Sequence, residues 1–312
     1  MMRSAWIKWA RAVEHQRVLA RQSREFVEVD SHEYVRFDNA NDDSDPLLRI
    51  QWRLHVKQPY PEQWSLLIGD ILTNLRAALD HALWAAVIAH SGPPPRPQAI
   101  QFPIATTAKK LRQPRSELAE LVTAEVWQAV ESLQPLQAQS DQHLHPLEIL
   151  RWLCNVDKHR FVHVVGRTSI DLTPVHIASP TPLEIIDEWR HEGPVADGAA
   201  VASLKIKRPA DGRIRLDLQP TFSLLATLQI SDDPIDHRSL RAVMDGIRDA
   251  VLWVLVTLTK ASGQPVPDPG SLELGDFHET VAAQYAGHLG IVRHADGTLT
   301  PIPSPPEDNT PD

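Results

Sequence analysis

The stretch from residue 62 to residue 90 reads EQWSLLIGDILTNLRAALDHALWAAVIAH. At about 100° per residue, its apolar side chains fall on one side of a helix and its polar side chains on the other. The apolar side carries Trp64, Ile68, Ile71, Leu75, Leu79, Ala82 and Ala86. The opposite arc carries Asp70, Thr73, Asn74, Arg76, Asp80, His81 and Trp84. The spacing predicts a long amphipathic helix, ended by the proline run that follows Gly92.

On either side of that helix, segments of helical period and segments of alternating period follow one another. Helical spacing predicts helices over 4–27, 116–133, 143–160, 237–262 and 279–286, the first anchored by Trp6, Trp9, Val13 and Ala20. Alternation predicts strands over 34–38, 48–56, 161–165, 175–177, 202–207 and 213–218. The turn residues Ala-Asp-Gly at 210–212 predict that the last two strands form a hairpin. We therefore expect an α+β fold in which an antiparallel sheet packs against a helical bundle.

This order of elements favours one α+β domain over residues 1–290. Its helical core would comprise about 1–160 and 237–262, and its strand-rich part about 161–232. A division into two domains near Gly166 is the alternative. Residues 297–312 are rich in proline and acidic side chains and poor in apolar ones, so we expect a disordered tail.

Composition limits the classes of function. The chain has 312 residues, 42% of them hydrophobic and 23% charged, which is typical of a soluble protein. No apolar run approaches the roughly 20 residues that span a bilayer, so we expect a cytoplasmic protein without a membrane segment. The net charge of −9 argues against wholesale coating of nucleic acid but leaves room for a local basic patch. The single Cys154 lies on an apolar helical pattern and predicts a buried, reduced thiol.

Motifs for cofactors and metals are missing from the sequence. It contains no glycine-rich phosphate loop, no Gly-x-Ser-x-Gly elbow and no dinucleotide fingerprint. The His143-x-His145 and His159-x3-His163 patterns lack helical i,i+4 geometry with a third ligand nearby. We therefore expect neither a cofactor nor a metal.

The polar arc of the central helix allows two interpretations. In the first, Arg76 and Asp80 form an ordinary i,i+4 ion pair and His81 faces water or caps a partner helix. In the second, Arg76 stabilises a developing phosphorane charge while His81 transfers a proton. These two functions suffice, without metal, for attack of an RNA 2′-hydroxyl on its own phosphodiester.

A basic cluster, Asp157-Lys158-His159-Arg160, ends the helix predicted over 143–160. Cations at this end interact favourably with the helix macrodipole and need no ligand to explain them. Alternatively, Lys158 and His159 meet Asp80 or His81 across the bundle and complete a site made from two helices.

Five short motifs together resemble a family of bacterial and phage proteins that is widespread in actinobacteria. They are WSLLIGD at 64–70, NLRAALDH at 74–81, FPI at 102–104, LQP at 133–135 and DKHR at 157–160. The helical part in turn resembles the HEPN superfamily on its helix order and its Arg-x4-His pair. That superfamily consists of four-helix-bundle proteins, often dimeric, and includes metal-independent RNases of toxin and defence systems.

The HEPN resemblance implies that Arg76 and His81 are catalytic, that RNA is the substrate and that the protein is a homodimer. Supporting positions would be Asn74, Asp80, Asp157, Lys158 and His159. Two features depart from the pattern of active members, because Ala77 replaces a commonly polar residue and the motif helix comes early in the chain. Many HEPN-like proteins are inactive, so a non-catalytic binding or scaffold module using the polar face of the central helix is the alternative.

Overall fold

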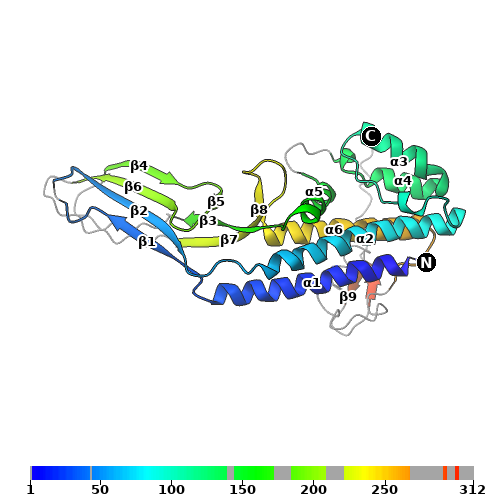
Figure 1. Cartoon of the computed structure of the whole chain (residues 1–312), viewed down its shortest axis with the longest axis horizontal. Helices are drawn as coiled ribbons and strands as arrows, with labels where there is room; N and C mark the ends of the chain where they lie inside the picture. The colour runs from blue at the N-terminus through cyan, green and yellow to red at the C-terminus, as the bar shows by residue number, and fades with distance from the viewer. Residues whose placement is uncertain are drawn as a thin grey trace, which may run out of the picture. The chain divides into compact units, whose positions relative to one another are not determined.

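The computed structural model describes residues 2–42, 44–138, 144–171, 184–208, 221–267, 291–293 and 299–301. The chain forms two compact units, and Figure 1 traces it from the N-terminus in blue. The helical unit consists of Met1–Arg17, Asp70–Asn155 and Asp245–Asp312, and the sheet unit consists of Val18–Gly69 and Val156–Met244. The fold class is α+β, as predicted.

The helices are α1 (Arg3–Glu28), α2 (Gln63–Ser91), α3 (Ala108–Leu118), α4 (Ala124–Ser132), α5 (Pro146–His159) and α6 (Leu240–Ala261). Short 3₁₀ turns lie at Pro97–Ala99, Ala119–Leu121 and Pro135–Gln137. The predictions for α1, α2, α5 and α6 are confirmed, with ends displaced by no more than a turn. Each of these four helices contributes residues to both units, so the division does not fall at the alternative boundary near Gly166.

Helix α2 buries the face that its periodicity predicts. All seven predicted apolar side chains are almost completely inaccessible to solvent, and Leu72, Leu83 and Val87 are buried beside them. The buried arc is therefore wider than the one predicted. The helix ends where Gly92 adopts a positive φ of 72° and donates its N–H to the carbonyl of Ile88 at 3.3 Å.

Two tryptophans fix the first half of α1 against α6. The indole N–H of Trp6 donates to the hydroxyl of Thr259 at 3.3 Å, and that of Trp9 donates to the carbonyl of Arg248 at 3.2 Å. Both rings are buried and meet edge to face, with centroids 6.3 Å apart. Ala20, expected as a further anchor of this helix, is exposed.

The single helix predicted over 116–133 is wrong. The structure has the end of α3, a 3₁₀ turn and α4 in its place. The break occurs because Val122 is extended (φ −132°, ψ 167°) and Thr123 caps α4, its hydroxyl accepting the N–H of Val126 at 3.3 Å. Apolar spacing continued through the break and concealed this cap.

The sheet unit contains two four-stranded antiparallel sheets. Sheet A has the order β1 (His32–Asp38), β2 (Leu47–Val56), β6 (Ala200–Lys207) and β4 (Glu184–Arg190). Sheet B has the order β5 (Pro194–Val195), β3 (Val164–Asp171), β7 (Thr221–Gln229) and β8 (His237–Ser239). The predicted antiparallel pairing of the strands at 34–38 and 48–56 is confirmed, whereas His237 begins a strand rather than a helix.

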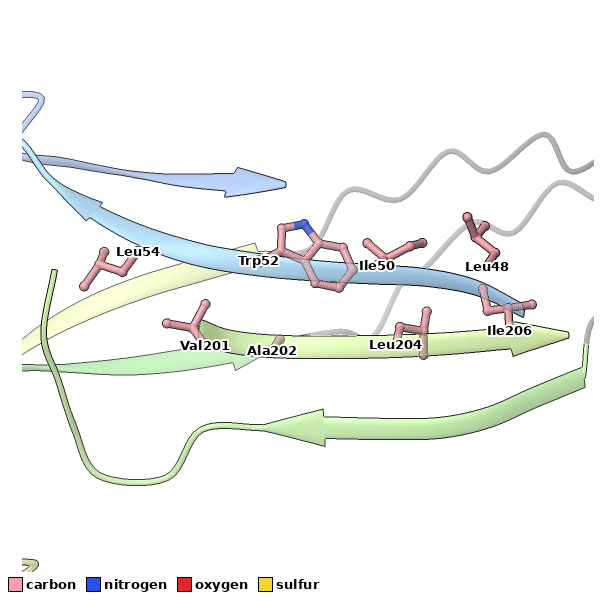
Figure 2. Packing of buried hydrophobic residues seen from close by; sticks show 8 residues of the cluster. All are labelled: Leu48, Ile50, Trp52, Leu54, Val201, Ala202, Leu204 and Ile206. Carbon is pink, nitrogen blue, oxygen red and sulfur yellow. The ribbon is translucent and has the colours of Figure 1, made fainter. Parts of the chain in front are cut away.

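One face of sheet A forms a hydrophobic core. Side chains from β2 and β6 line it, as Figure 2 shows: Leu48, Ile50, Trp52, Leu54, Val201, Ala202, Leu204 and Ile206. Phe222 and Leu224 of sheet B pack against this cluster, and the ring of Tyr34 stacks on Phe222 with centroids 4.3 Å apart. The two sheets therefore form a sandwich around this core.

The hairpin predicted from 202–207 and 213–218 does not form along β6, because β2 and β4 occupy both edges of that strand. The segment 213–218 itself lies outside the described residues, as do the predicted strand at 175–177 and the predicted helix at 279–286. Within the predicted tail, β10 (Leu299–Pro301) pairs with β9 (Ile291–Arg293), and the other residues of 297–312 lie outside the described part.

Candidate functional site

The structure brings Arg76 and Asp80 together and joins both to one backbone residue. The guanidinium of Arg76 contacts both carboxylate oxygens of Asp80, with Nη2 at 3.0 Å from Oδ1 and Nε at 3.2 Å from Oδ2. Nη2 also donates to the carbonyl of Phe102 at 2.9 Å, while the N–H of Phe102 donates to Oδ1 of Asp80 at 2.8 Å. The ion pair therefore satisfies the donor and the acceptor of the same peptide residue, and we name this arrangement the Phe102 clamp.

The Phe102 clamp is only partly accessible to water. The side chains of Arg76 and Asp80 are 24% and 25% exposed. Burial raises the pKa of Asp80 above its ordinary value of 3.8, against the opposing effects of Arg76, the Phe102 N–H and His81. Desolvation of this carboxylate thus outweighs its favourable contacts, which is typical of an ion pair that specifies a structure more than it stabilises it.

A second clamp holds the same loop three residues later. The amide of the buried Gln134 accepts the N–H of Ala105 at 2.8 Å and donates to the carbonyl of Val130 at 2.8 Å. The N–H of Leu136 donates to the carbonyl of Ala105 at 3.1 Å. The loop that follows α2 is therefore fixed at residues 102–105 by side chains from α2 and from the segment that follows α4.

His81 does not join the Phe102 clamp. Five residues correspond to roughly 140° around a helix, so Arg76 and His81 point away from α2 in different directions. His81 is half-buried and forms no hydrogen bond with any other described residue. Among the described residues, Arg76 is therefore hydrogen-bonded and His81 is not, although the resemblance makes both catalytic.

Asn74 points away from the Phe102 clamp, on the side of α2 that carries His81. Its amide nitrogen donates to the carbonyl of Asp70 at 2.8 Å, one turn earlier. Its side-chain oxygen accepts from the ammonium of Lys8, on α1, at 3.4 Å. Because residues 74 and 81 are separated by two helical turns, they share this side of α2 with Lys8.

The basic cluster at the end of α5 meets α2 elsewhere. The carboxylate of Asp157 lies against Gly69, where a Cβ would stand 2.6 Å from Oδ1. Gly69 precedes Asp80 by eleven residues (80 − 69) on the same helix. Lys158 and His159 are exposed and form no hydrogen bond or ion pair within the described ranges.

The histidine and cysteine patterns have local structural explanations. The Nδ1 atom of His145 accepts the N–H of Leu147 at 3.2 Å at the start of α5, and burial lowers the pKa of His145. The thiol of Cys154 is half-buried and donates to the carbonyl of Leu72 at 3.7 Å. His143 lies outside the described residues. Where the structure is described, no group of three histidine, cysteine or acidic side chains is placed to hold a metal ion.

Sequence reasoning missed three members of this region: Lys8, Gln134 and the backbone of Phe102. Lys8 and Gln134 lie far from the central helix in sequence, and a backbone group leaves no residue pattern at all. The one available signal was the presence of FPI at 102–104 and LQP at 133–135 among the five motifs.

The helices of the described residues include none that is long and apolar enough to cross a bilayer. Comparison with protein-family models, with curated proteins and with solved structures finds no match to this chain. The HEPN resemblance therefore stays a prediction.

Proposed function

We propose that this protein is a non-catalytic binding or scaffold module in which Arg76 and Asp80 serve the fold. One observation carries the proposal: both side chains are bonded to the backbone of Phe102. An arginine that stabilises a transition state must direct its donors at the reacting group. Here three of the donor contacts of Arg76 are directed at Asp80 and at a carbonyl of its own chain.

The polar face that receives a partner is the part of α2 that the Phe102 clamp leaves uncovered. Asp70 and Thr73 are exposed there, and Asn74 and His81 are half-buried. Carboxylate, hydroxyl, amide and imidazole groups in one strip supply both donors and acceptors, which suits a polar partner surface.

The test of this proposal is an RNA cleavage assay combined with stability measurements. Purified wild type, Arg76→Ala and His81→Ala are incubated with structured and unstructured RNA in EDTA. We expect no cleavage by any of the three proteins, together with a loss of stability in Arg76→Ala that His81→Ala does not share. Thr73→Ala, at an exposed position of the same helix, is the matched control for stability.

A second candidate function is a metal-independent RNase or RNA-binding protein of a toxin or defence system, acting as a homodimer. The observation that favours it is the placement of Lys8 beside Asn74, on the side of α2 that carries His81. A cation on the same side of α2 as His81, two helical turns away from it, can attract phosphate even in a protein of net charge −9. His81 would then act as general acid or base, and Arg76 would reach the phosphate from the partner subunit.

The same assay separates the two functions. Cleavage by wild type that leaves 2′,3′-cyclic phosphate ends, and that both Arg76→Ala and His81→Ala abolish, would establish the RNase and refute the scaffold proposal. Equal cleavage by all three proteins would indicate a contaminating nuclease. Lys8→Ala adds a further arm, because RNA binding that weakens in this variant alone supports a binding rather than a catalytic function.

A further inference from the structure

Strand β4 ends sheet A and is exposed along its whole length. Among the described strands it pairs only with β6, so no described strand covers its other edge. Every residue of Glu184–Arg190 is exposed, including three large apolar side chains: Ile185 at 49%, Ile186 at 48% and Trp189 at 43%. A sheet edge that no strand covers is a template on which another strand can add through backbone hydrogen bonds.

The second half of β4 has the regular geometry that such pairing needs. A bulge interrupts the register with β6 between Ile185 and Asp187. From Asp187 onward the pairing with β6 is continuous, and the N–H of His191 extends it by donating to the carbonyl of Val201 at 2.9 Å. Residues 187–191 therefore form an edge of five residues whose pairing with β6 no bulge interrupts.

The charges along this edge are self-complementary. Residues 187–191 read Asp-Glu-Trp-Arg-His, with two acidic residues before the tryptophan and two basic residues after it. In an antiparallel pair related by a two-fold axis at Trp189, Glu188 lies opposite Arg190 of the other copy, and Asp187 lies opposite its His191. The two tryptophans then form a cross-strand aromatic pair on one face.

Within one chain, these charged groups already make exchangeable contacts. Nε of Arg190 donates to Glu188 at 2.9 Å, and Lys205 donates to Asp187 at 2.6 Å. All four side chains are more than a third exposed, so each pair contributes little to stability and can rearrange. The edge thus offers charges that a second copy can meet without breaking a buried interaction.

We propose that two copies of this protein pair edge to edge through residues 187–191 of β4, antiparallel and centred on Trp189. Two sheets of four strands then become one continuous sheet of eight. The partner is a second copy because a strand whose charges reverse about its centre complements itself in antiparallel orientation. A basic or an acidic peptide would match only half of it. The pairing is independent of the role of Arg76 and His81.

The experiment is sedimentation equilibrium of the full chain over a range of concentrations, with charge-reversed variants. Wild type is expected to dimerise. Arg190→Glu places like charges opposite each other twice per dimer and is expected to raise the dimer dissociation constant by about tenfold or more. Glu188→Arg combined with Arg190→Glu restores opposite charges, both within the strand and between copies, and is expected to restore the dimer.

Trp189→Lys and Trp253→Lys form a matched pair, because both tryptophans are about half exposed and Trp253 lies on α6 in the helical unit. Only Trp189→Lys is expected to abolish the dimer, with the circular dichroism of both variants unchanged. A monomeric wild type overturns the proposal, as does a dimer that survives Trp189→Lys and Arg190→Glu. Failure of the double charge reversal to restore the dimer also overturns it. Loss of the dimer in Trp253→Lys places the interface on the helices instead.

Discussion

Replacing Arg76 and Asp80 by alanine, singly and together, tests whether the Phe102 clamp is structural. Asp80→Ala removes three contacts to one carboxylate, at 2.8, 3.0 and 3.2 Å, and leaves a half-buried guanidinium unpaired. A fully buried pair would cost 3–5 kcal/mol on such truncation and an exposed pair about 0–1 kcal/mol. With both side chains about one quarter exposed, we expect each single change to cost about 2 kcal/mol of unfolding free energy.

The double variant is the informative member of the cycle. Because each single change already leaves its partner without a counter-ion, removing both is expected to cost about 2–2.5 kcal/mol rather than the sum of about 4 kcal/mol. The measurement is urea denaturation followed by tryptophan fluorescence and by circular dichroism, with coincident transitions required. Single effects that add within about 0.5 kcal/mol would refute the structural pair. Faster hydrogen exchange of the Ala105 N–H, which Gln134 rather than Asp80 accepts, in Asp80→Ala would confirm independently that the clamp holds the loop.

Four further predictions concern the framework around this site. Gly69→Ala is expected to destabilise the protein by about 1 kcal/mol, because a Cβ would lie 2.6 Å from the carboxylate of Asp157. In an Asp157→Ala background the same substitution should be neutral or stabilising, and calorimetric melting measures both effects. The free energy of unfolding should fall as pH decreases below about 6.5. Burial lowers the pKa of His145 in the folded protein, so the unfolded chain takes up a proton there at a higher pH than the folded chain does. His145→Asn, which keeps an acceptor for the Leu147 N–H, should make stability depend less on pH in this range. Thr123→Ala should cost about 1 kcal/mol through loss of the cap of α4, and Thr123→Ser should recover it in denaturant titrations. Leu75→Asp places a charge in the core and should abolish cooperative unfolding, so a soluble variant with an unchanged melting temperature would contradict the burial of this face.

The long helices could be predicted because the helical spacing of apolar residues runs through each of them without a break and because clear sequence signals mark where they end. Seven apolar positions repeat through α2, and prolines follow it, so both its extent and its buried face are recovered from sequence. The helix predicted over 116–133 failed for the opposite reason. Apolar spacing is the same on both sides of Thr123, and only the local backbone of Val122 separates α3 from α4.

Strand order was the least accessible feature. The pattern of β6 predicts a strand, but nothing in it states that β2 and β4 lie on its two edges. The turn signal at 210–212 favoured a hairpin with the segment that follows β6. The structure instead pairs β6 with the preceding strand β4 on one edge and with β2, about 150 residues earlier, on the other. Such long-range pairing is decided by the shared core around Trp52 rather than by turn chemistry.

The candidate site shows why short motifs are ambiguous evidence for catalysis. Arg76 and Asp80 lie in one motif and Phe102 in another, and the structure joins them by hydrogen bonds. Gln134, from a third motif, fixes the same loop at Ala105. Three of the motifs that suggest a relationship therefore meet in contacts that position a loop.

The remaining two motifs follow the same principle. Gly69 and Asp157 pack so closely that a side chain at position 69 would require Asp157 to move. A chain that preserves this contact and the Phe102 clamp preserves a fold, and it would carry the same motifs whether or not it cleaved RNA. The residues that discriminate between the two functions are consequently those that neither contact uses. His81, without a hydrogen bond among the described residues, and Lys8, which reaches α2 through Asn74, are the positions at which catalysis or RNA binding must be tested.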